Sequence, residues 1–239
     1  MSEPIDGHGA SQDGACAPPV GAACRESDPA QPSRIKILDT GERLFALHGF
    51  AGVGLREVAD DVGLGKSSLF HHYPSKARLY AAVVERVMRD FDSRLAACDV
   101  RGRSAIERLH AWVDTAIDAL TEHPSWAPLL LRRMVEVDVL DLELESQLEA
   151  INDGIIQRIS AALRDGIAAG ELREISIPHT IHTLIAMTVF YFAASDFSEG
   201  LLREPITDEE PVRARRKHIH DYVETALRAK ARAGDASLG

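Results

Sequence analysis

Leu55–Lys76 reads LREVADDVGLGKSSLFHHYPSK, and this stretch decides the fold of the chain. Apolar residues three and four apart predict one short helix over 55–62 and another over 66–72, joined by a glycine turn at 63–65. Pro74 ends the second helix. A turn this short lets one helix pack against its neighbours while the other projects, which is the geometry needed to enter a DNA major groove about 12 Å wide.

The charge of the chain is unevenly distributed along its length. The net charge of −10 argues against a nucleic-acid partner for the protein as a whole. Residues 33–80, called the head below, carry seven Lys or Arg against five Asp or Glu, whereas the other residues carry 20 basic and 32 acidic side chains. Salt confines electrostatic attraction to roughly 8–10 Å. The head can therefore bind phosphates while the acidic remainder stays away from DNA.

The composition excludes several classes of protein. An apolar content of 45% and a charged content of 27% are typical of a globular chain. No run approaches the roughly 18 apolar residues of a membrane span, and the N-terminus lacks the apolar core of an export signal. Cys16, Cys24 and Cys98 are too few and too scattered for a disulfide framework or a zinc site. We therefore expect a cytoplasmic protein with no membrane partner.

Helical periodicity runs through nearly the whole chain from Ser33, whose hydroxyl is a suitable N-cap. Residues 1–32 are rich in Gly, Ala, Pro, Ser and Asp and predict a disordered tail. No segment alternates as a strand does, so the predicted fold class is all-α, with the head at 33–80 and an all-helical body at 81–239. Beyond the first three, helices are expected over 76–98, 106–120, 125–137, 141–169, 178–197 and 212–232, with a polar loop at 198–211.

Two glycines shape the first helix of the head. Gly41 lies in its apolar row, where Gly costs about 1 kcal/mol relative to Ala, so a neighbouring helix is expected to approach closely there. Gly49 is expected to end the helix, and Phe50 to pack back onto it.

The second helix of the quoted stretch carries the groups that DNA recognition needs. Lys66, Ser67 and Ser68 lie in its first turn, where free backbone N–H groups and the helix dipole also favour a phosphate. The Phe70 ring can contact a sugar or a thymine methyl group. Arg56, on the preceding helix, can reach the DNA backbone or a guanine. His71 and His72 are either part of this face or ordinary surface histidines.

The order Gly49-Phe50, Val58-Ala59, Gly63-Leu64, Leu69–Tyr73 and Pro74–Lys76 resembles the tetracycline-repressor (TetR) family over about residues 35–87. The resemblance implies a three-helix head with a helix-turn-helix, followed by a fourth helix and a variable all-helical ligand-binding and dimerisation body. It also implies that Lys76 binds phosphate, and we expect Tyr73 to be half-buried with its hydroxyl outward. The predicted DNA-contacting residues are Arg56, Lys66, Ser67, Ser68, Phe70, His71, His72, Tyr73 and Lys76.

The chain departs from the family pattern at four positions. Val53, Gly54 and Gly65 replace the usual Ser or Thr, which removes two hydroxyl helix caps and a phosphate-binding hydroxyl. Phe70 stands where the family usually has Tyr, so a phenolic hydrogen bond worth about 1 kcal/mol is lost.

The body is expected to dimerise, to bind a ligand, or to do both. By resemblance, the last two helices would pair with their copies through Thr188, Tyr191, Phe192, Ile219, Tyr222, Val223 and Ala226. A ligand pocket between helices would be lined by Trp112, Trp126, Leu130, Met134, Ile151, Ile155, Met187 and Phe190. For each of these residues, plain core packing is the competing interpretation, because an all-helical domain needs such side chains in any case.

The sequence contains few signals of an enzyme or of a metal site. The chain has no glycine-rich phosphate loop, no nucleophile elbow and no HExxH motif. His179 and His182 are one helical turn apart, but no third ligand is placed convincingly. We therefore predict no catalytic residue, no metal site and no cofactor.

The predicted function is a dimeric repressor that a small molecule releases from a double-stranded, palindromic operator. Two alternatives remain open. The chain could be a transcriptional activator, or a dimeric DNA-binding module that responds to no ligand.

Overall fold

The computed structural model describes residues 30–98, 100–136 and 140–229, and the regular elements in these ranges are all helical. Residues 1–29 of the predicted tail lie outside the described residues. Leu172 and Arg228 form an isolated β-bridge. The helices are α1 (Ala30–Gly52), α2 (Leu55–Val62), α3 (Lys66–His72), α4 (Lys76–Ala97), α5 (Ala105–Glu122), α6 (Trp126–Val135), α7 (Leu142–Ala168), α8 (Ile177–Ile185), the π-helix η1 (Ala186–Phe190), α9 (Tyr191–Ala193), α10 (Ser195–Leu202), α11 (Glu209–Tyr222) and the π-helix η2 (Val223–Leu227).

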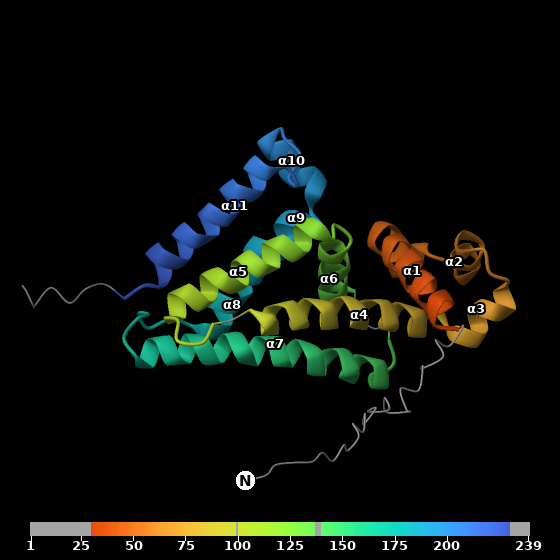
Figure 1. Ribbon diagram of the computed structural model, residues 1–239, viewed down its shortest axis with the longest axis horizontal. Coiled ribbons are helices and arrows are strands. Elements are labelled where there is room, and N and C mark those ends of the chain that lie inside the picture. Colours follow the sequence, from red (N-terminus) through yellow and green to blue (C-terminus); the bar gives the residue numbers. More distant parts are fainter. Residues whose placement is uncertain (1–29, 99, 137–139, 230–239) are drawn as a thin grey trace, which may run out of the picture.

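The helices form a small head joined to a larger body by one long helix. Figure 1 shows α1, α2 and α3 at one end of the molecule, with α4 running from them into the body. In the body α4 lies between α5 and α7 and contacts both. Helix α6 stands where the head meets the body, and it contacts α1 as well as α4. The all-α fold predicted from the sequence is confirmed.

The first helix packs closely on α4 at a glycine. A Cβ atom on Gly41 would lie 3.0 Å from Cγ2 of Val83, so the expected close approach of a neighbouring helix is confirmed. Phe45 is fully buried beside it, and its ring meets the ring of Tyr80 edge-on at 5.1 Å. These contacts join α1 to α4 through a continuous apolar core.

Both ends of α1 can be compared with the ends predicted from the sequence. The helix begins at Ala30, three residues before the predicted start at Ser33. Gly49 leaves helical geometry with φ +69°, as expected for the residue that ends the regular helix. The ring of Phe50 then turns back, 6.5 Å from that of Phe45.

The predicted single helix over 178–197 is divided into several pieces. Residues 186–190 form a π-helix, and the backbone of Ala194 leaves helical geometry with φ −104° and ψ 50°. The chain then turns by 86° into α10. Helix α10 occupies the first part of the predicted polar loop at 198–211, which is therefore shorter than expected.

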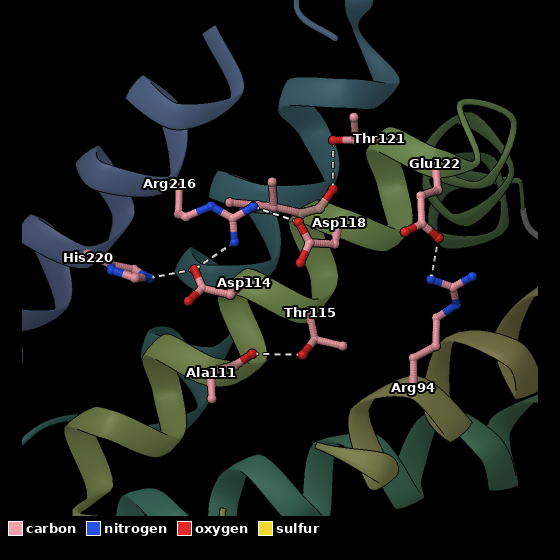
Figure 2. A network of polar contacts seen from close by, with 10 residues as sticks. Arg94, Ala111, Asp114, Thr115, Asp118, Thr121, Glu122, Arg216 and His220 are labelled. Carbon is pink, nitrogen blue, oxygen red and sulfur yellow. Dashed lines mark hydrogen bonds and ion pairs between the residues drawn. The ribbon is translucent and has the colours of Figure 1, made fainter. Parts of the chain in front are cut away.

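Helix α11 contacts α5 through charged side chains. Figure 2 shows Arg216 between Asp114 and Asp118, with ion pairs of 2.9 and 2.6 Å, and His220 beside Asp114 at 2.8 Å. The imidazole rings of His220 and His110 stack at 4.0 Å. Burial lowers the pKa of His110, and the neighbouring His220 lowers it further.

Within the described ranges, no single helix is both long and apolar enough to cross a membrane. Only the bent pair Ile177–Ala193 and Ser195–Leu202, taken together, meets that criterion of length and composition.

Candidate nucleic-acid interface

The two helices of the quoted stretch are buried on one side only. Val58 on α2 and Leu69 on α3 are fully buried in the core of the head. Between the helices Gly63 adopts φ +76°, a conformation that favours glycine. The N–H of Leu64 then donates to the carbonyl of Ala59 at 2.9 Å. The turn therefore holds α3 in a fixed position relative to α2.

The other side of α3 faces solvent. Lys66, Ser67, Ser68, Phe70 and His71 are exposed, whereas His72 is half-buried. The Lys66 ammonium lies 5.4 Å from the centre of the Phe70 ring, so the cation and the apolar ring are side by side. These residues lie where the sequence analysis places them, and their contacts with DNA remain a prediction.

The glycines at the starts of α2 and α3 provide no side-chain cap. At α2, however, the carboxylate of Glu57 accepts a hydrogen bond from the N–H of Gly54 at 3.3 Å. This contact was not predicted, although Glu three residues after an N-cap is a known signal for it. One of the two caps thought to be missing is thus partly replaced.

Arg56 is one of the exposed predicted contacts. Its side chain is 85% exposed and lies 3.9 Å from the carboxylate of Asp60, a distance that gives only a weak interaction. The guanidinium is therefore held only weakly by its neighbour.

Tyr73 differs from its prediction. Its side chain is only 5% exposed, and its hydroxyl accepts a hydrogen bond from Nε of Arg34 at 3.2 Å. Tyr73 was expected to be half-buried with its hydroxyl outward, but it packs in the core with its hydroxyl against Arg34 of α1. We therefore remove it from the DNA-contacting set.

Lys76 also differs from its prediction. Its ammonium donates to the carbonyl oxygens of Phe50 at 2.7 Å and Val53 at 3.0 Å, and lies 3.5 Å from that of Ala51. It also lies 4.4 Å from the centre of the Phe50 ring. An ammonium group has three N–H donors, and here they point at the C-terminal end of α1. The phosphate-binding role implied by the family resemblance therefore does not fit Lys76, which instead caps α1.

Helix α6 holds the end of α1 from the side of the body. Arg132 donates from Nη2 to the carbonyl of Leu47 at 3.4 Å and lies 3.5 Å from Glu136. A Cβ atom on Gly49 would lie 2.7 Å from Nη1 of Arg132, so the arginine occupies the space beside that glycine. Burial raises the pKa of the Tyr80 hydroxyl, and the nearby Glu136 carboxylate raises it further.

Two adjoining cavities lie in the body. The outer cavity, of about 560 Å³, is bounded by α6, α7, α8 and η1, and the inner cavity, of about 90 Å³, by α4, α5, α7 and the α8–η1 segment. They adjoin at residues that belong to both walls: Asn152, Ile156, Ile185 and Val189.

The predicted pocket residues divide into two groups. Met134 and Phe190 line the outer cavity, and Trp112 and Ile155 line the inner one. The other four predictions are wrong, since Trp126, Leu130, Ile151 and Met187 line neither cavity and pack against the core instead. Apolar spacing selects the inward side of each helix but does not show which inward residues border an empty space.

The predicted dimer seam is internal. Thr188, Tyr191 and Phe192 are 4–8% exposed, and Ile219 and Val223 are fully buried, within a single chain. Tyr222 and Ala226 are half-buried and pack on the same core. A π-helix takes one extra residue per hydrogen-bonded turn, so counting from the start of α8 assigns the wrong face beyond η1. The exposed apolar residues in this region are Phe190, Phe197, Leu201 and Leu202.

The described ranges contain no group of three or more His, Cys, Asp or Glu side chains arranged to hold a metal ion. His179 and His182, considered in the sequence analysis, are both exposed on α8.

Two family models match the chain. The model described as "Bacterial regulatory proteins, tetR family" covers residues 37–83, and "Tetracyclin repressor-like, C-terminal domain" covers residues 106–223. The HTH-type transcriptional repressor SCO4008 of Streptomyces coelicolor is 26% identical over 158 residues, which is 66% of this chain and 77% of the relative.

Solved structures share the fold at low sequence identity. A transcriptional regulator from Saccharomonospora viridis in complex with choline superposes with a TM-score of 0.67 at 20% identity, covering 84% of this chain and all of the other. AibR, in complex with isovaleryl coenzyme A and operator DNA, superposes with a TM-score of 0.66 at 18% identity, covering 79% of this chain and 96% of the other.

Proposed function

This chain belongs to the tetR family of bacterial regulatory proteins, and on that premise we propose that it is a homodimeric repressor that a small molecule releases from its operator. It is a helix-turn-helix transcription regulator and not an enzyme. Repression is supported by the relative SCO4008, which is named a repressor. We place the protein in the cytoplasm, where its DNA would lie.

The DNA contacts are assigned to the exposed face of α3 and to Arg56. Lys66, Ser67 and Ser68 approach phosphates or base edges from the first turn, while Phe70 contacts a sugar or a thymine methyl group. His71 and His72 extend this face toward the end of α3. Tyr73 and Lys76 keep α3 in place without touching DNA.

The body binds the effector in the outer and inner cavities. Two of the structural neighbours are complexes with small molecules, choline and isovaleryl coenzyme A, which supports a ligand-binding role for the corresponding body. The outer cavity lies within the roughly 300–1,000 Å³ that ligand sites usually occupy.

One structural observation supports coupling between the effector site and the operator-binding head: α6 contacts both. Leu131 and Met134 of α6 line the outer cavity, while Arg132 of the same helix and Ser125, its N-cap, hold α1. Ser125 donates to the carboxylate of Glu42 at 2.5 Å. A ligand that moves α6 by a fraction of an ångström therefore also moves the head, and its difference in affinity for the two positions sets how far operator binding falls.

A second copy of the chain would cover the exposed apolar residues at η1 and α10. The rings of Phe190 and Phe197 lie 6.5 Å apart, and Leu201 is 69% exposed. Burying such a surface in a symmetric dimer would place two heads on the half-sites of a palindromic operator.

Operator binding tests the assignment of the head. A DNA duplex selected from a random library by the purified protein serves as the operator in gel-shift titrations. Lys66→Ala should weaken binding by about tenfold or more. The matched control is Lys217→Ala, which removes an exposed lysine of the body that pairs with Asp221. Equal affinities for the two variants would contradict the assignment of α3 as the recognition helix.

A further inference from the structure

The walls of the two cavities are almost entirely hydrocarbon. The outer wall consists of Leu, Met, Ile, Pro, Ala, Val and Phe side chains, with Asn152, Ser160 and His182 as its polar members. No Asp, Glu, Lys or Arg lines either cavity in the part of the chain that the structure describes. Among the described wall residues, His182 is the one titratable side chain, so the site offers a charged ligand a single imidazole at most.

A charged ligand would lose its hydration without compensation in these cavities. An ion moved from water to an apolar site needs a counter-ion or several hydrogen bonds. A quaternary ammonium group would instead need aromatic faces around it. Among the described wall residues, Phe190 lines the outer cavity and Phe91 and Trp112 line the inner one, so no cage of aromatic faces surrounds the outer cavity. Anionic and cationic ligands are therefore both poorly matched to the wall.

One polar group in the wall lacks a partner. Trp112 lines the inner cavity, its side chain is 7% exposed, and its Nε1 is buried without a hydrogen bond to any described residue. An indole N–H can only donate. A buried donor without an acceptor is unfavourable, so this N–H is open to an acceptor atom of a bound molecule.

We propose that the effector is an uncharged, mainly hydrocarbon molecule carrying one oxygen atom that accepts a hydrogen bond from Nε1 of Trp112. Its oxygen-bearing end enters the inner cavity, and its apolar part fills the outer cavity. The amide of Asn152, where the two cavities adjoin, contacts the ligand between these parts. This inference rests on the proposed function for its biological meaning, but binding can be measured without DNA.

Four probes with similar alkyl chains separate the effects of head-group charge. The fluorescent probe N-phenyl-1-naphthylamine is first bound to the full-length protein and then displaced by 2-undecanone, undecanoate, decyltrimethylammonium or decanoyl coenzyme A. The uncharged ketone should displace it with an affinity about tenfold or more above that of each charged probe. Equal or stronger displacement by any charged probe would overturn the proposal.

The two tryptophans provide a matched pair of variants. Trp112→Phe keeps an aromatic ring but removes the N–H, and it should weaken 2-undecanone binding about fivefold, the value of one neutral hydrogen bond. Trp126→Phe is the control, because Trp126 is equally buried, stacks on His123 at 4.2 Å and lines neither cavity. If the two variants bind the ketone equally well, the role of Trp112 is wrong.

Gel shifts with the selected operator separate this inference from the proposed function. Tight binding of 2-undecanone without release of DNA would leave the ligand class standing and contradict release by this class of ligand. Release of DNA by a charged probe that binds more tightly than the ketone would leave release standing and overturn the ligand class.

Discussion

Replacing the two lysines of the helix-turn-helix stretch should affect two different properties of the protein. Lys76 donates two hydrogen bonds, of 2.7 and 3.0 Å, to carbonyl oxygens at the end of α1 and contacts the Phe50 ring. Lys66 is exposed, and its only described contact is the Phe70 ring at 5.4 Å. Lys76→Ala should therefore reduce stability, whereas Lys66→Ala should reduce DNA binding.

The loss at Lys76 can be sized from its contacts. A hydrogen bond from a charged donor contributes about 1.5–3 kcal/mol when buried, and less at a half-buried site such as this. The contact with the ring adds about 0.5–1 kcal/mol. Together they give an expected loss of about 2–3 kcal/mol in the free energy of unfolding. For a chain of this length, the thermal midpoint should fall by roughly 5–10 °C.

Thermal unfolding and salt-dependent gel shifts distinguish the two roles. Lys66→Ala should leave the free energy of unfolding within about 0.5 kcal/mol of the parent. It should also make the salt slope of operator binding shallower by about one unit. Lys76→Ala should lower the midpoint and, measured where the protein is folded, keep the parent slope. Lys76→Met, which keeps the stem against Phe50, should lie between the parent and Lys76→Ala in stability. A shallower salt slope with an unchanged midpoint in Lys76→Ala would refute this reasoning.

Three further predictions concern packing, pH and assembly. Gly41→Val should lower the free energy of unfolding by about 1–3 kcal/mol in urea titrations, because α4 leaves no room for the added atoms; no change would mean that α4 can move aside. Burial and His220 lower the pKa of His110, so the unfolded chain takes up this proton first and stability should fall as the pH drops below about 6.5. His110→Gln should weaken that pH dependence of stability, and the exposed control His218→Gln should preserve it. Equal stability profiles for the two variants would contradict the role of His110. Phe197→Glu should shift sedimentation toward a smaller species, and an unchanged oligomer would exclude α10 from the interface.

The head could be predicted closely because its signals are local. Gly49 and Gly63 adopt positive φ at the ends of helices, and Pro74 follows α3. Each of these residues acts on its own stretch of backbone, so its effect is the same whatever lies nearby. Leu69, the apolar residue between the exposed side chains of α3, is fully buried.

Tyr73 and Lys76 could not be placed from the sequence because their partners lie far along the chain. Arg34 is 39 residues before Tyr73, and Phe50 is 26 residues before Lys76. A lysine at the start of a helix looks the same whether its ammonium meets a phosphate or a carbonyl. Only the position of α1 decides between these roles.

The body was harder to predict for a different reason. Helical periodicity assumes 3.6 residues per turn, and the π-helices η1 and η2 interrupt it in both of its last long helices. Tyr191 and Phe192, which follow η1, were therefore assigned to the wrong side. The cavities were equally hidden, because an apolar side chain that borders a void has the same sequence signature as one that is fully packed.

The contact between Arg132 and Gly49 limits how heads and bodies can be exchanged between relatives. A recombinant regulator that received residues 33–80 alone would bring Gly49 without the arginine that fills the space beside it. It would also bring Glu42 without Ser125, its partner on the neighbouring helix. Residues 125–136 should therefore be transferred together with the head, although more than 40 residues separate the two segments in the sequence. A chimaera designed from domain boundaries alone would lack these contacts between the head and the body. We expect one that also receives residues 125–136 to keep them, and with them the coupling between effector and operator binding.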